Sequence, residues 1–165
     1  MANKLLSIDP GFRYFGYCVF NENSEIEQAD CINLESVSDW DKWTRQPPSF
    51  SKFSELIESL EWEKGCEAII EFPQIHRDTP NPDDILMLTS ACGAYTSILQ
   101  SYGFQVSWVR PRAWKGTVPK KVMYNRILAK VKDFEYTKIK SVKNHNTIDA
   151  VGIGLWKISK TSRKF

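Results

Sequence analysis

Three acidic residues stand at points where this chain could place a carboxylate beside its core. Asp9 and Glu71 each follow a run of apolar residues, and Asp149 lies in the small, apolar stretch 145–152. An ionised carboxylate at the end of a buried strand is costly unless a cation or a hydrogen-bond donor meets it. Carboxylates brought together favour Mg²⁺ or Mn²⁺, which prefer hard oxygen ligands. The three acids therefore indicate metal-assisted phosphoryl chemistry.

Asp9 also has a simpler explanation. The sequence Asp9-Pro10-Gly11 is ordinary turn chemistry, in which the acid caps its own turn. The two acids further along the chain favour the ligand role over the cap. On that interpretation Pro10-Gly11 reverses the chain abruptly, so that the next strand leaves Asp9 uncovered.

The elements that would position these acids alternate between strands and helices. Apolar and β-branched runs predict strands, and apolar residues at helical spacing predict helices. The first three strands follow one another directly, which suggests an antiparallel meander, and an irregular excursion over 35–50 separates them from the first helix. The expected strands are 5–9, 12–20, 25–34, 67–71 and 104–109, and the expected helices are 51–64, 83–101, 119–131 and 144–158.

Such a mixed α/β sheet collects ligands at the carboxyl ends of its strands. If strands 5–9 and 67–71 are parallel neighbours, Asp9 and Glu71 lie at one rim of the sheet. The last helix brings Asp149 to this rim if that acid faces the sheet. His145 and Asn146, four and three residues before Asp149, can share its face.

The charge is distributed unevenly along the chain. Residues 1–109 carry 7 Lys and Arg against 17 Asp and Glu, a net charge of −10, whereas residues 110–165 carry 15 against 3, a net charge of +12. A basic third interleaved with aromatic residues favours a phosphate-backbone partner. The alternative is a solvated basic face that complements the acidic part of the molecule.

Composition limits the class of protein. With 165 residues, 42% of them hydrophobic, the chain predicts a single globular domain over 1–165, with a basic tail over about 157–165. No run has the length of a membrane span and no signal peptide is evident, so we expect a cytosolic protein. The cysteines lack metal-ligand spacing, which argues against zinc and favours reduced thiols; they are Cys18, Cys31, Cys66 and Cys92.

Three motifs resemble one known family. Ile8-Asp9-Pro10-Gly11, Ile70-Glu71 and the segment 145–150 (His-Asn-Thr-Ile-Asp-Ala) look like the RuvC-type Holliday junction resolvases of the ribonuclease H-like superfamily, most of all its phage-encoded or divergent members. The resemblance implies a ribonuclease H-like α/β fold, with a mixed five-stranded sheet flanked by helices. It also implies a metal-dependent endonuclease that cleaves four-way and other branched DNA junctions.

The resemblance further implies an active site. Asp9, Glu71 and Asp149 would ligate two Mg²⁺ ions, which Mn²⁺ can replace. Family members often place another Asp or a His three residues before the last acid, but here Asn146 occupies that position and His145 precedes it. We expect His145 to take the fourth role, as a metal ligand or a group that orients water, while Asn146 stays open as a neutral ligand. The alternative is a capping or phosphate-contacting histidine.

The expected contacts to nucleic acid follow the last strand. Family members use lysines before and at the start of the next helix, where this chain has Lys115, Lys120 and Lys121. Trp114 either stacks on a base or pins its loop. The family's junction-opening aromatic residue is replaced here by Gln74, and Phe72, beside the acid, is more simply a core or rim residue. The further expected contacts are Arg110, Arg112, Lys140 and Lys143.

The sequence also leads to expectations about binding partners and leaves other functions to be considered. The resemblance implies a homodimer acting on branched DNA, with no membrane and no small-molecule cofactor, in the cytoplasm of a bacterial or phage-infected cell. A nuclease acting on RNA–DNA hybrids or flaps is the main alternative. An actin-like or sugar-kinase-like ATPase also carries Asp-Pro-Gly on its first strand, but it needs glycine-rich phosphate loops. A non-catalytic junction-binding module would not need all three acids.

Overall fold

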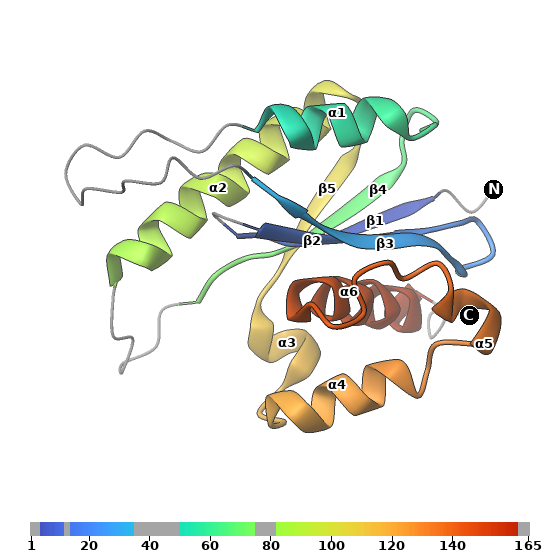
Figure 1. Ribbon diagram of the computed structural model, residues 1–165. Coiled ribbons are helices and arrows are strands. Elements are labelled where there is room, and N and C mark those ends of the chain that lie inside the picture. The colour runs from blue at the N-terminus through green and yellow to red at the C-terminus, as the bar shows by residue number, and fades with distance from the viewer. Residues whose placement is uncertain (1–3, 12–13, 35–49, 75–81, 162–165) are drawn as a thin grey trace.

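The computed structural model describes residues 4–11, 14–34, 50–74 and 82–161 (Figure 1). The expected excursion over 35–50 lies outside these ranges except for Phe50, and so do residues 162–165 of the expected basic tail. The elements are β1 (Leu5–Asp9), β2 (Tyr14–Phe20), β3 (Ile26–Asn33), α1 (Ser51–Ser59), β4 (Glu67–Glu71), α2 (Pro82–Ser101), β5 (Gln105–Val109), α3 (Pro111–Lys115), α4 (Lys120–Leu128), α5 (Asp133–Tyr136) and α6 (His145–Thr161).

The strands form one mixed sheet in the order β3-β2-β1-β4-β5. β1, β2 and β3 pair antiparallel, and β1, β4 and β5 pair parallel. The predicted five-stranded α/β sheet with an initial antiparallel meander is therefore confirmed. Because β1 and β4 run in the same direction, their carboxyl ends meet at one edge of the sheet.

Helices cover the two faces of the sheet differently (Figure 1). α1 and α2 lie on one face, where Phe15, Phe53 and Tyr95 form an aromatic core with the Phe53 and Tyr95 rings 4.7 Å apart. α6 lies on the other face, with α3, α4 and α5 around it. Successive side chains of a strand alternate between faces, so that Leu6 and Ile8 belong to the aromatic side. Asp9 therefore projects toward α6.

The helix boundaries depart from the sequence prediction in the basic third of the chain. The segment 110–118, between the expected strand 104–109 and the expected helix 119–131, contains a further helix, α3. It starts with Pro111 at its first position and ends before Gly116 at φ +63°. α6 continues to Thr161, so residues 157–161 of the expected tail are helical. Within the described residues, no helix combines the length and the apolar character needed to cross a membrane.

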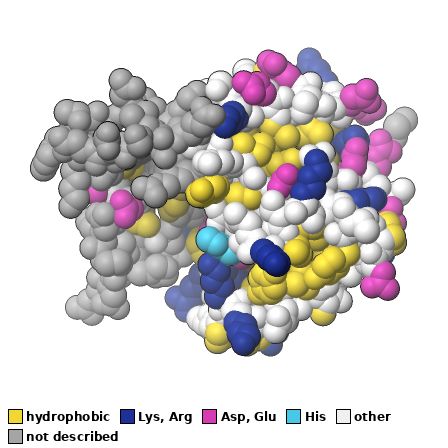
Figure 2. Space-filling model, in the orientation of Figure 1, with side chains coloured by type: hydrophobic (Ala, Val, Ile, Leu, Met, Phe, Trp, Pro, Cys, Tyr) yellow, Lys and Arg dark blue, Asp and Glu magenta, His cyan; other side chains and the backbone are white. Residues whose placement is uncertain are grey.

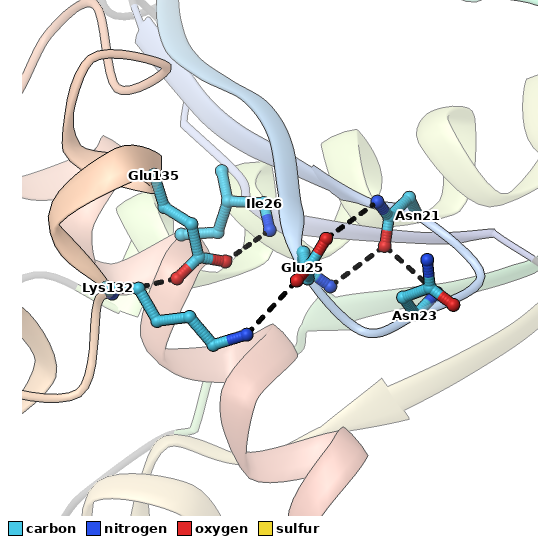
Figure 3. A network of polar contacts seen from close by, with 6 residues as sticks. All are labelled: Asn21, Asn23, Glu25, Ile26, Lys132 and Glu135. Atoms are coloured by element: carbon cyan, nitrogen blue, oxygen red, sulfur yellow. Dashed lines mark hydrogen bonds and ion pairs between the residues drawn. The ribbon is translucent and has the colours of Figure 1, made fainter.

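α5 docks on the outer strand of the sheet through a buried acid (Figure 3). Glu135 accepts hydrogen bonds from the backbone N–H groups of Ile26, at 2.6 Å, and Lys132, at 2.8 Å. The chain after α5 then runs beside β3, where Ala29 exchanges backbone hydrogen bonds with Lys138 and Lys140. The Lys-rich segment 132–142, between the expected helices 119–131 and 144–158, therefore covers the edge of β3.

Candidate active site

Two predicted site residues end neighbouring parallel strands. Ile8 of β1 pairs with Ile70 of β4, so Asp9 and Glu71 are the next residues along the same edge of the sheet. Both side chains project toward α6, because Leu6, Ile8, Ala68 and Ile70 occupy the opposite face. Asp9 is only 9% exposed. The parallel pairing therefore delivers both carboxylates to one place, as the sequence predicted.

The third acid, Asp149, comes from α6, which is held unusually close to the sheet. The Ser7 hydroxyl donates a 2.7 Å hydrogen bond to the carbonyl of Ala150, the residue after Asp149. A Cβ added at Gly16 would lie 2.0 Å from the carbonyl oxygen of Asn146. Since Gly16 pairs with Asp9 across β1 and β2, this contact fixes the start of α6 beside Asp9. Asp149, one turn further on, then joins the acids at the strand ends.

α3 contributes two neighbouring side chains to the same cluster. The indole nitrogen of Trp114 donates a hydrogen bond to Glu71 Oε2. Lys115 Nζ lies 3.4 Å from that same oxygen and 3.7 Å from Asp149 Oδ2. Trp114 is buried rather than exposed for stacking on a base. In this structure the side chains of Trp114 and Lys115 therefore both contact the carboxylates of the cluster.

The electrostatics show that the acids crowd one another. Burial, together with the charges of Glu71 and Asp149, raises the pKa of Asp9 well above its usual value. Burial also raises the pKa of Glu71, although Lys115 and Trp114 oppose the shift. Burial alone would lower the pKa of Lys115, but Glu71, Asp149 and Asp9 together raise it. The site therefore favours positive charge, as a cation-binding site must.

The chemistry of these side chains suits a divalent cation, but their spacing in this structure is not that of a closed metal site. The three carboxylates supply the hard oxygen atoms that Mg²⁺ and Mn²⁺ prefer. Among the residues that the structure describes, no group of three or more His, Cys, Asp or Glu side chains is close enough to hold a metal ion. The cation that contacts Glu71 and Asp149 is the Lys115 ammonium.

His145 and Asn146 lie at the start of α6, beside this cluster. Partial burial and the positive charge of Lys120 lower the pKa of His145, which favours its neutral imidazole. The Asn146 side chain donates a 3.3 Å hydrogen bond through Nδ2 to the carbonyl of Tyr14. A neutral imidazole can accept a proton or a hydrogen bond, while the contact made by Asn146 ties α6 to β2. That His145, or Asn146 in its place, joins the three acids as the fourth active-site residue stays a prediction.

The predicted nucleic-acid contacts divide into two groups. Arg112 is exposed on α3, Arg110 just before it, and Lys120 and Lys121 at the start of α4, where the charge of Lys120 acts on Asp9. Figure 2 shows Lys and Arg side chains gathered over this part of the molecule, while acidic side chains gather over the α1 side. The backbone of Lys140 pairs with β3 instead, and Lys143 is exposed on the turn that leads to α6.

One exposed aromatic residue, on the face of the sheet opposite to the acids, was not singled out in the sequence. Trp108, on the edge strand β5, is 54% exposed and stacks on Phe72 with the ring centroids 4.6 Å apart. Its indole nitrogen donates to the Thr96 hydroxyl on α2. Phe72 is half-buried and packs against the core, in agreement with the rim position expected for it. The alternation of β5 could have indicated that Trp108 faces α2.

Comparison with known proteins shows the fold. No protein-family model and no curated protein matches the sequence. Thermus thermophilus RuvC in complex with a Holliday junction substrate is similar, with a TM-score of 0.65 and 15% identity over 98% of this chain and 96% of that chain. A second T. thermophilus RuvC structure has a TM-score of 0.59 and 16% identity over 98% and 96% of the two chains.

The yeast mitochondrial Holliday junction resolvase Ydc2 is also similar, with a TM-score of 0.55 and 16% identity. That alignment covers 98% of this chain and 81% of the yeast chain. Each likeness extends over nearly the whole of this chain. The expected ribonuclease H-like architecture is therefore confirmed in the form that these structures share.

Proposed function

We propose that this protein is a metal-dependent endonuclease that cleaves four-way DNA junctions. The observation that carries the proposal is the convergence of Asp9, Glu71 and Asp149 on one face of a RuvC-like fold. A basic surface on α3 and α4 lies beside these acids. The similarity to a RuvC structure bound to a Holliday junction supports branched DNA as the substrate.

The position of each residue in the site suggests its role in the reaction. Asp9, Glu71 and Asp149 would hold Mg²⁺, which when bound activates water for attack and stabilises the leaving oxygen. Trp114 keeps Glu71 oriented through its hydrogen bond. The neutral His145 imidazole beside the acids accepts a proton or orients the attacking water.

The basic residues bind the backbone of the substrate. Arg110, Arg112, Lys120 and Lys121 are exposed next to the acids and supply phosphate contacts, which position nucleic acid without reading its sequence. Lys140 and Lys143, exposed on the segment that leads to α6, would contact a second arm of a branched substrate. Such contacts make binding weaker as the salt concentration rises.

A homodimer suits a four-way junction, because the junction presents two equivalent strands to be cut. Leu86, Ser90 and Ser97 are exposed along α2, and Leu86 is 60% exposed. Their spacing places them on one side of the helix, away from the residues of α2 that enter the core. We propose that two copies pair through this side of α2. The variant Leu86→Glu should shift the sedimentation of the protein from dimer to monomer, and an unchanged dimer would reject this interface.

A substrate panel tests the function directly. Wild-type protein is incubated with a four-way junction, a flap, a linear duplex and an RNA–DNA hybrid, each with Mg²⁺, Mn²⁺ or a chelator. We expect paired nicks in the four-way junction with either metal and no cutting with the chelator. Preferential cutting of the hybrid would favour a ribonuclease instead. Failure to cut the junction under every condition would reject the proposal.

A further inference from the structure

Lys115 bridges two of the acids that would hold the metal. Its ammonium lies 3.4 Å from Glu71 Oε2 and 3.7 Å from Asp149 Oδ2, and its side chain is 29% exposed. Its ammonium is thus an ion-pair partner of both carboxylates at once. An ion coordinated by Glu71 and Asp149 would have to occupy the region that this ammonium now fills.

We propose that Lys115 is a built-in counter-ion, which a divalent metal displaces from Glu71 and Asp149 and which then binds a DNA phosphate. This inference rests on the proposed nuclease function and adds a regulation to it. The metal releases Lys115 for the phosphate, and the phosphate draws Lys115 away from the carboxylates. Each ligand therefore favours the binding of the other, since coupling between two sites is reciprocal.

The surroundings of Lys115 allow this movement. It is the last residue of α3, and the following Gly116 has φ +63° in open space, where an added Cβ would meet nothing within 4 Å. An adjoining cavity of about 400 Å³ extends from Asp149 past Thr117 to Lys120. A displaced ammonium can therefore turn toward Lys120, on the basic surface, without disturbing the sheet. A phosphate in this cavity would meet both lysines.

Metal affinity in the absence of DNA is the first test. Mn²⁺ binding is measured by electron paramagnetic resonance for wild-type protein, Lys115→Met and the matched control Lys121→Met, which removes the same charge from the exposed start of α4. We expect Lys115→Met to bind Mn²⁺ about tenfold more tightly, which corresponds to about 1.4 kcal/mol. We expect Lys121→Met to change the affinity less than about twofold, because exposed charges are screened. Equal affinities in the two variants would overturn the proposal.

A second variant and a second readout guard against a folding defect. Lys115→Gln removes the charge but keeps a polar side chain, and it should tighten Mn²⁺ binding as Lys115→Met does. Because ligands stabilise the state that binds them, both variants should show a larger rise of Tm on adding Mn²⁺ than wild-type protein shows. A rise no larger than that of wild-type protein would contradict the displacement.

The coupling is tested with Ca²⁺ as a probe and a fluorescent four-way junction. Junction affinity is measured by anisotropy with Ca²⁺ and with a chelator, for wild-type protein and Lys115→Met. We expect Ca²⁺ to strengthen junction binding several-fold more in wild-type protein, and equal strengthening would reject the coupling. A protein that binds metal as predicted but cuts no junction would reject the nuclease and leave the Lys115 inference standing. If the wild-type protein cleaves the junction but Lys115→Met binds Mn²⁺ no more tightly than wild type, the Lys115 inference is rejected and the nuclease function stands.

Discussion

Two buried acids in this molecule, Glu135 and Asp9, have opposite surroundings. Glu135 is 5% exposed, and two backbone N–H groups donate to its carboxylate (Figure 3). Asp9 is 9% exposed, and no hydrogen bond to its side chain is found among the described residues. Its nearest charges include two further acids, which raise its pKa together with burial.

The contrast separates an acid that supports the fold from one for which we propose a functional role. A buried carboxylate is tolerated when donors replace the water that it loses. Glu135 has such donors and uses them to attach α5 to β3. No such donor to Asp9 is found in the part of the chain that the structure describes, and the nearby Lys115 contacts Glu71 and Asp149 instead. These surroundings support the proposal that Asp9 binds a cation rather than stabilises the fold.

Removing Glu135 should produce the largest change in stability. Glu135→Ala leaves the N–H groups of Ile26 and Lys132 without their acceptor, and we expect a loss of about 3 kcal/mol, or roughly 6–12 °C in Tm. Thermal unfolding by circular dichroism measures it. The neighbouring, less buried acid offers a control, since Glu25→Ala removes a more solvent-accessible ion pair with Lys132 and a long hydrogen bond from Asn21 Nδ2. Similar losses of Tm in Glu135→Ala and Glu25→Ala would contradict a special contribution of the buried acid to stability.

A methyl group at Gly16 should disturb the contact between β2 and α6. The added Cβ of Gly16→Ala would lie 2.0 Å from the backbone oxygen of Asn146, which cannot turn aside as a side chain could. We expect α6 to move outward at a cost of about 2 kcal/mol. Asp149 moves with it, so Mn²⁺ affinity should fall as well as Tm. A variant with wild-type Tm and wild-type Mn²⁺ affinity would show that this contact does not position Asp149.

Neutralising Asp9 should stabilise the metal-free protein, the opposite of the effect at Glu135. Because the folded-state pKa of Asp9 is raised, its ionisation lowers stability as the pH rises from the ordinary pKa of aspartate to the raised one, and the full loss is present above it. We expect Asp9→Asn to gain about 1 kcal/mol at pH 7.5 in chelator, or roughly 2–4 °C in Tm. The gain should vanish below about pH 4, where aspartic acid is protonated in both states. Destabilisation at pH 7.5 would place Asp9 with the structural acids.

Much of the sheet and the three acids could be predicted from the sequence. The apolar runs that end at Asp9 and Glu71 contain the strand pattern and the acid in one short segment. Asp149 was predictable because a lone acid interrupts an apolar helix. These signals are local, and the parallel pairing of β1 with β4 then brings the residues together.

The remaining features depend on contacts between distant segments. Trp114 and Lys115 lie in a segment that resembles a loop, and only the folding of α3 against α6 turns both side chains toward Glu71. Glu135 is one acid in a Lys-rich segment, and nothing beside it in sequence indicates that it docks on Ile26. Such roles follow from tertiary packing, which local patterns do not contain.

Cleavage of a synthetic four-way junction by wild-type protein and Asp9→Asn tests the central claim most directly. Nicking with Mg²⁺ and junction binding in chelator are measured side by side, with Glu135→Gln as a control for an amide placed at a structural acid. We predict that wild-type protein and Glu135→Gln nick the junction, whereas Asp9→Asn stays at background and still binds it within about twofold of wild type. Nicking by Asp9→Asn at the wild-type rate would contradict the assignment of this carboxylate cluster as the catalytic site.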